Sequence, residues 1–75
     1  MALVSHLEKI ALEGGAEHRP VECTYSIVNG QSGLYLQIDT YGFRDRKIPG
    51  KKSQSIRLTR EAIKELKAII EANFD

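Results

Sequence analysis

The chain has 75 residues and a mass of 8.4 kDa, which suffices for one domain spanning residues 1–75 but not for two independent hydrophobic cores. Hydrophobic residues make up 41% of the chain and charged residues 28%, a composition that excludes a disordered protein. Because the formal net charge is only +1, any attraction to a polyanion must come from a local cluster of charges.

Residues 3–13 can be interpreted in two ways. Leu3, Leu7 and Ile10 recur at helical spacing, and Gly14 would end a helix, which predicts a short N-terminal helix. The same residues also fit an irregular edge strand, since the segment is too short for its periodicity to separate the two. Both interpretations stay open.

Two segments of alternating apolar and polar residues follow, at 21–28 and 34–41. Residues 29–33 lie between them and include two glycines and an asparagine, residue types that accept the positive φ values of hairpin turns. The sequence therefore predicts a β-hairpin. The polar side of its second strand is formed by Tyr35, Gln37, Asp39 and Tyr41.

A turn-rich basic stretch, residues 42–52, leads to a third predicted strand at residues 53–58. Between positions 44 and 60 the chain has one acid and seven bases, a local charge of +6, so the remainder carries −5. Such a run is either a solvated loop or a surface that attracts phosphates. The seven bases are Arg44, Arg46, Lys47, Lys51, Lys52, Arg57 and Arg60.

The last segment predicts a helix over residues 60–73. Thr59 is a good N-cap, and Glu61 is favourable at the positive end of the helix. Apolar residues recur every three to four positions along one side. They are Ala62, Ile63, Leu66, Ile69, Ile70 and Phe74.

These segments together predict an α+β fold, a twisted antiparallel sheet of three or four strands followed by one C-terminal helix, with or without the short N-terminal helix. We expect the helix to cover the apolar face of the sheet and to leave the polar face open to solvent or to a partner. The residues expected under the helix are Val21, Ile27, Leu36, Ile38, Ile56 and Leu58.

The residue inventory gives little support to catalysis. His6, His18 and Cys23 do not have the spacing of zinc ligands, and no pair of acids forms a recognisable motif. We therefore expect no catalytic residue, no metal and no cofactor. No apolar run approaches the roughly 20 residues of a membrane-spanning helix, and Cys23 has no partner for an internal disulfide, so we expect a cytosolic protein without a membrane partner.

The polar side of the predicted sheet offers a better candidate site. Tyr35 and Tyr41 present flat rings, Gln37 can hydrogen-bond base edges, and Arg57 can stack or contact a phosphate. Because a base can stack on a side chain only when it is unpaired, this set favours single-stranded nucleic acid. Alternatively, the tyrosines only reinforce cross-strand packing, or are covered by the N-terminal segment or a second subunit.

Four segments, in the same order, resemble the C-terminal domain of the transcriptional coactivator Positive Cofactor Four. They are residues 34–41 (LYLQIDTY), 49–52 (PGKK), 55–58 (SIRL) and 59–67 (TREAIKELK). The resemblance implies a twisted antiparallel sheet followed by a helix, dimerisation through the helices, and binding of single-stranded or melted DNA across the sheets. Lys51 and Lys52 match the family's basic pair after Pro-Gly, and Arg57 lies on the strand that follows.

The chain also departs from that family. Ala62-Ile63 stands where the family commonly has an aromatic residue, residues 53–55 replace its usual glycine, and the first 20 residues have no counterpart.

We therefore expect a single-stranded nucleic-acid-binding module that acts in transcription, replication or repair without catalysis. Its partners would be single-stranded DNA or RNA and a second copy of the chain, through Ile63, Ile70 and Phe74. The alternative is a protein-interaction module that uses the open sheet face or the C-terminal helix. The predicted nucleic-acid-binding residues are Tyr35, Gln37, Tyr41, Arg44, Arg46, Lys47, Lys51, Lys52 and Arg57.

Overall fold

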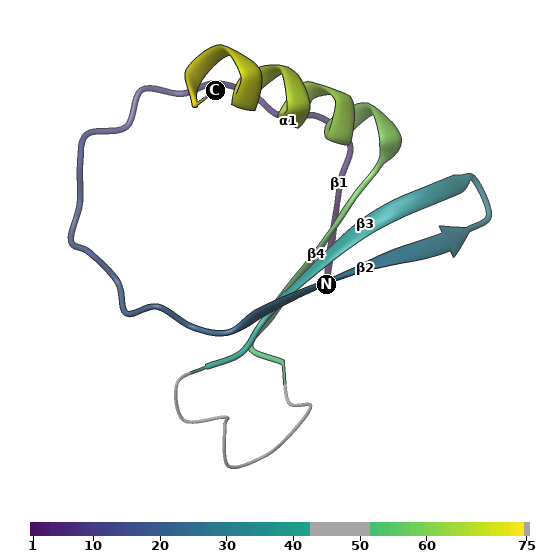
Figure 1. Ribbon diagram of the computed structural model, residues 1–75, viewed down its shortest axis with the longest axis horizontal. Coiled ribbons are helices and arrows are strands. Elements are labelled where there is room, and N and C mark those ends of the chain that lie inside the picture. The colour runs from purple at the N-terminus through teal and green to yellow at the C-terminus, as the bar shows by residue number, and fades with distance from the viewer. Residues whose placement is uncertain (43–51, 75) are drawn as a thin grey trace.

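The computed structural model describes residues 1–42 and 52–74, which form a four-stranded sheet followed by one helix (Figure 1). The order of strands in the sheet is β1-β4-β3-β2. Strands β2, β3 and β4 pair antiparallel, as the sequence predicts, and β1 joins the edge of β4 in parallel. The α+β fold is therefore confirmed. The elements are β1 (Ala2–Val4), β2 (Cys23–Gly30), β3 (Gly33–Thr40), β4 (Gln54–Leu58) and α1 (Arg60–Asn73).

The predicted hairpin is formed by β2 and β3. Gly30 pairs with Gly33, which leaves only Gln31 and Ser32 to make the turn. Gly33 has a φ of 124°, a value that side-chain-bearing residues rarely adopt, so the turn depends on glycine at this position. The two strands stay paired over their full length, from this turn back to Cys23 and Thr40.

The N-terminal residues form an edge strand and no helix. The Thr59 N–H donates to the Val4 carbonyl at 3.0 Å, which extends the contact between β1 and the end of β4. The Leu7 N–H, which would bond to Leu3 within a helix, instead donates to the Glu65 carboxylate of α1 at 2.7 Å. A helix of about ten residues has little stability of its own, so these tertiary contacts decide the structure.

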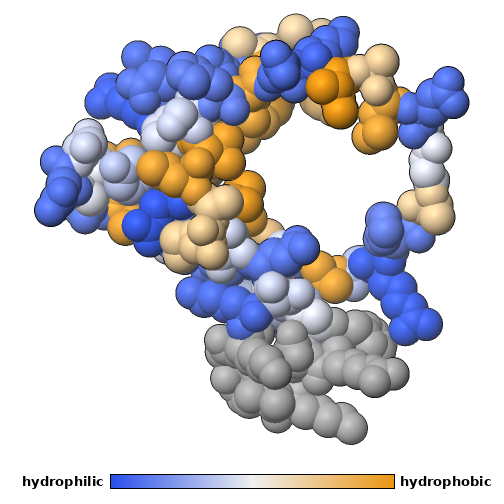
Figure 2. Space-filling view, turned by 180° about the vertical axis from the view of Figure 1, so that it is seen from behind, coloured by the Kyte–Doolittle hydropathy of each residue, from blue (hydrophilic) through white to orange (hydrophobic). Residues whose placement is uncertain are grey.

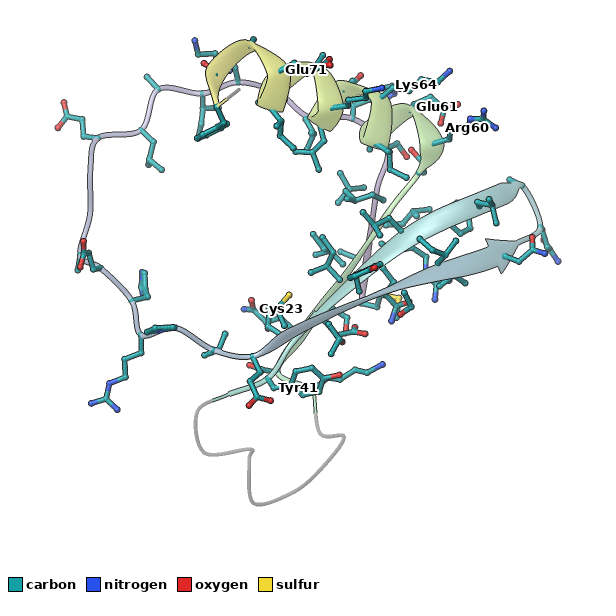
Figure 3. All side chains as sticks on the ribbon, viewed as in Figure 1. Cys23, Tyr41, Arg60, Glu61, Lys64 and Glu71 are labelled. Carbon is teal, nitrogen blue, oxygen red and sulfur yellow. The ribbon has the colours of Figure 1, made fainter. Side chains whose placement is uncertain are left out.

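Helix α1 begins as predicted. The Thr59 hydroxyl accepts a hydrogen bond from the Ala62 N–H at 3.3 Å, and Glu61 lies in the first turn. Ala62 and Leu58 are buried where the helix leaves β4, and they form the centre of a small core. Arg60, Glu61, Lys64 and Glu71 lie on the opposite side of the helix and point away from the sheet (Figure 3).

Helix α1 covers less of the sheet than the sequence predicts. Leu58 is buried and Leu36 and Ile38 are half-buried, but the other residues expected under the helix are exposed. The helix starts at one end of β4 and extends away from the sheet, and residues 5–22 arc around an opening between the two (Figure 1). In the space-filling view, apolar side chains gather around this opening (Figure 2). The exposed residues of the prediction are Val21, Ile27 and Ile56.

Candidate nucleic-acid interface

The register of the sheet brings the predicted polar residues together on one face. Across β3 and β4, Gln37 pairs with Arg57 and Asp39 with Ser55. Because paired residues of neighbouring strands project to the same side, these four side chains lie on one surface, and the alternation along β3 adds Tyr35. We call this surface the polar face. It consists of Tyr35, Gln37, Asp39, Ser55 and Arg57.

Tyr35 lies on the polar face near the hairpin turn, beside Gly30. A Cβ atom added to Gly30 would lie only 2.3 Å from Cε2 of the tyrosine ring, so the ring occupies the space that glycine leaves free. The guanidinium carbon of Arg57 lies over the same ring, 5.9 Å from its centre. Tyr35 is thus half-buried between a backbone and a cation, which is the arrangement of a cation–π pair.

Arg57 is held in this position by a neutral side chain. Its Nε donates to Oε1 of Gln37 at 3.1 Å, and its Nη2 donates to the same oxygen at 2.5 Å. An amide oxygen fixes the direction of the guanidinium without cancelling its charge, as a carboxylate would. Among the described residues no carboxylate is paired with Arg57, so its positive charge is oriented and can attract an anion.

Asp39 is the most buried residue of the polar face and is only 2% exposed. Its carboxylate accepts the Ser55 hydroxyl at 2.5 Å and the Gln37 amide nitrogen at 3.1 and 3.2 Å, and Lys52 Nζ lies 3.4 Å away. The hydrogen bond from Ser55 is the main cause of a lowered pKa for Asp39; those from Gln37 and Lys52 add to it, and together they outweigh the desolvation that raises it. Asp39 is therefore charged at neutral pH.

Tyr41 lies just beyond the end of β3. Its N–H donates to the Glu22 carbonyl at 3.0 Å, and its hydroxyl lies 3.0 Å from the Thr24 hydroxyl. Figure 3 shows Tyr41 and Cys23 on opposite sides of the sheet, as strand alternation predicts. Tyr41 therefore extends the polar face at the end opposite the hairpin turn, where it is half-buried.

The basic residues of the prediction are divided between two parts of the chain. Arg57 and Lys52 are described, and the Lys52 side chain is 46% exposed beside Asp39. The other four, Arg44, Arg46, Lys47 and Lys51, lie outside the described residues.

The polar face includes residues that sequence reasoning did not assign to the site. Gln37 was expected to contact bases, but it is only 6% exposed, and its amide bonds Arg57 on one side and Asp39 on the other. Asp39 and Ser55 were not predicted to take part. Asp39 did carry a signal, because a carboxylate in the middle of a strand must find buried donors.

The predicted dimerisation residues lie along α1 and differ in exposure. Ile63 is half-buried near the start of the helix, whereas Ile70 and Phe74 are exposed, Phe74 to 81%. On the sheet, Tyr25 and Ile27 of β2 are 75% and 62% exposed. We call the exposed set Tyr25, Ile27, Ile70 and Phe74 the apolar surface.

Within residues 1–42 and 52–74, no three side chains of His, Cys, Asp or Glu come together as a metal site. His6 lies 3.3 Å from Glu65 of α1, and Cys23 is a free, exposed thiol. None of the described helices has the length and apolar character that a membrane-spanning segment needs.

The site thus defines an α+β domain with an aromatic and cationic sheet face. Comparisons of the chain with protein-family models, with curated proteins and with solved structures gave no match.

Proposed function

We propose that the polar face binds single-stranded nucleic acid, without catalysis. The observation that carries this proposal is the position of Arg57, which lies over the Tyr35 ring and is oriented by a neutral amide. The guanidinium lies on the ring and has no carboxylate partner among the described residues, so its plane offers a stacking surface for a base and its charge a contact for a phosphate. Single-stranded DNA or RNA is therefore the ligand class.

Single strands are favoured over duplex for a geometric reason. Tyr35 and Tyr41 lie on a sheet surface. A base can stack on such a surface only when its flat side is free. Such a contact contributes about 1–3 kcal/mol per base, and a duplex must unpair before it can form. The resemblance to Positive Cofactor Four supports the same preference and favours DNA, with roles in transcription, replication or repair.

Phosphates would be bound by Arg57 and Lys52, together with the basic residues between positions 44 and 51. The ammonium of Lys52 is partly offset by Asp39, so Arg57 is the stronger cation of the described face. In this proposal Arg44, Arg46, Lys47 and Lys51 supply the remaining charge. Binding through phosphates releases counterions, so affinity falls as salt rises.

The proposal includes a homodimer formed through the apolar surface. Leu58 and Ala62 are the only buried apolar residues in the described part of the chain, while large side chains of β2 and α1 are exposed. A second copy that packs α1 against this surface would remove Ile70 and Phe74 from water and complete the core. Sedimentation of the protein as a single subunit at micromolar concentration would contradict the dimer.

A second candidate function is a protein-interaction module. The exposed residues of the apolar surface favour it, because large apolar side chains left exposed to water can mark binding sites for other proteins. In this case the polar face would serve only solubility. A mobility-shift assay with labelled oligothymidine separates the two functions, since only the nucleic-acid module would retard the oligonucleotide.

The decisive test is a fluorescence-anisotropy titration with two matched variants. Arg57→Gln and Arg60→Gln each remove one positive charge, but Arg60 lies on the outer side of α1 (Figure 3). We expect Arg57→Gln to weaken binding to oligothymidine about tenfold and Arg60→Gln to stay within about twofold of the wild type. Equal effects of the two variants, or binding that does not depend on salt, would contradict the proposal.

A further inference from the structure

The hydrogen bonds across the polar face form a chain in which Arg57 donates to Gln37 and Gln37 donates to Asp39. Gln37 donates through its amide nitrogen to Asp39 and accepts through its amide oxygen from Arg57. An ionised carboxylate can only accept hydrogen bonds, and a guanidinium can only donate them. The amide of Gln37 therefore has one orientation that satisfies both neighbours.

The orientation of the Gln37 amide depends on Asp39 being a carboxylate. An asparagine at position 39 has nearly the same shape, but it could present its own amide nitrogen to Gln37. Because the Gln37 nitrogen contacts both oxygens of Asp39, one of its two acceptors would become a donor, and turning the Gln37 amide over would relieve this repulsion. The turned amide would present its nitrogen to Arg57, which has no acceptor to offer. Arg57 would lose its bond to Gln37 and, with it, its fixed position over Tyr35.

Asp39 also stands out because of its charge. It is a negative group directly under a surface that is proposed to bind a polyanion, and Coulomb's law alone makes it unfavourable there. The Ser55 hydroxyl, the Gln37 amide and Lys52 Nζ all face its oxygens, so the charge is partly neutralised in place. Its cost to nucleic-acid binding is thereby reduced.

We propose that Asp39 is a positioning residue, which acts through Gln37 to hold Arg57 over Tyr35 in the conformation that binds nucleic acid. This inference rests on the proposed function of the polar face. It makes a prediction opposite in sign to simple electrostatics, because removing a negative charge should weaken, not strengthen, binding to a polyanion.

The test compares Asp39→Asn with Glu61→Gln in oligothymidine binding by fluorescence anisotropy. Each variant removes one negative charge, and Glu61 lies on the outer side of α1, away from the polar face (Figure 3). We expect Asp39→Asn to bind about tenfold more weakly than the wild type and Glu61→Gln to bind within about twofold of it. Binding by Asp39→Asn that equals or exceeds that of the wild type would overturn the proposal.

A second readout reports the position of Arg57 directly. In a ¹H–¹⁵N spectrum, the Arg57 Nε–H should be protected from exchange with water in the wild type and in Glu61→Gln, and it should lose this protection in Asp39→Asn. Protection that persists in Asp39→Asn would overturn the positioning role whatever the affinities are. If the wild type fails to bind oligothymidine while its Arg57 signal is protected, the proposed function fails, but the relay of hydrogen bonds from Asp39 through Gln37 to Arg57 stands.

A third variant covers the case in which Asp39→Asn does not fold. Gln37→Met keeps the length of the side chain and interrupts the relay between Asp39 and Arg57. We expect the same weaker binding, about tenfold, and the same loss of Arg57 protection. Where both single variants fold, adding Asp39→Asn to Gln37→Met should reduce affinity no further, since the two act in series. Wild-type affinity in Gln37→Met, or additive losses in the double variant, would contradict the relay.

Discussion

The two faces of the sheet differ from the usual pattern, because polar side chains are buried on one face and apolar side chains are exposed on the other. On the polar face, Gln37 and Asp39 are buried and fully bonded, and no described buried polar side-chain atom lacks a partner. On the other face, Tyr25 and Ile27 are mostly exposed to water, as is Phe74 at the end of α1. A face whose polar groups bond one another is complete within one copy of the chain. An exposed apolar surface is not, and it gains stability only when something covers it.

The largest effect is expected when the apolar surface is made charged. Ile70→Glu would place a carboxylate where the proposed homodimer excludes water, at a cost of roughly 3 kcal/mol or more. We expect dimer dissociation to become at least about 100-fold more favourable. Sedimentation velocity over a concentration series measures this change.

Lys64→Gln provides the matched control, since it changes the net charge by the same amount on the outer side of α1 (Figure 3). It should leave the association unchanged. If Ile70→Glu sediments like the wild type, the apolar surface does not form the dimer contact, and its exposure needs another explanation.

A smaller effect is expected at the polar face when a side chain at position 30 displaces the Tyr35 ring. Gly30→Ala adds a Cβ that would lie 2.3 Å from Cε2 of Tyr35, so the ring must move. We expect the affinity for oligothymidine to fall about threefold to tenfold, because the stacking surface and the place beneath Arg57 both shift. Anisotropy titration measures the loss.

Gly14→Ala is the control for this substitution, as its Cβ would meet nothing within 4 Å. It should bind like the wild type. Unchanged affinity in a folded Gly30→Ala protein would show that the position of the Tyr35 ring does not affect binding.

The smallest effect is expected from the contact between the N-terminal segment and α1. The hydrogen bond from the Leu7 N–H, and then that from His6, lower the pKa of Glu65 from its ordinary value of 4.5. A lowered pKa in the folded state contributes stability that is complete above the unfolded pKa and is lost as pH falls through the folded pKa. Glu65→Gln should therefore flatten the loss of stability on acidification, as measured by urea unfolding at pH 7 and at lower pH.

Asp39 contributes to the same acid sensitivity, since its pKa is also lowered. Some loss of stability should therefore persist in Glu65→Gln. Glu71→Gln, on the outer side of α1, is the control and should follow the wild-type profile. A Glu65→Gln profile that matches the wild type would mean that the N-terminal contact contributes no stability.

Local patterns in the sequence predicted most of the fold. Alternation predicted β2, β3 and β4, the glycines around Gln31 and Ser32 predicted the hairpin, and Thr59 with the apolar repeat predicted α1. The N-terminal segment could not be decided in this way, because its structure depends on Thr59 and Glu65, more than 50 positions away. Tertiary hydrogen bonds of that kind leave no trace in a local pattern.

The same limit applies to the candidate site. Alternation placed Tyr35, Gln37 and Arg57 on one face, and the register of the strands agrees. It could not predict that Gln37 would be buried as a bridge between Arg57 and Asp39, since the bridge depends on cross-strand pairing and on rotamers. The sequence pattern also overestimated how many residues of the sheet the helix covers. The direction in which α1 leaves β4 is a property of the whole fold and cannot be predicted from a local pattern.

The central claim, that nucleic acid binds the polar face, can be tested most directly by mapping chemical shifts while unlabelled oligothymidine is added to ¹⁵N-labelled protein. We predict that the perturbed signals will cluster at Tyr35, Gln37, Lys52 and Arg57. Signals of Tyr25, Ile27 and Ile70 should stay in place. Perturbations confined to these apolar residues, or none at all at millimolar oligonucleotide, would contradict the account.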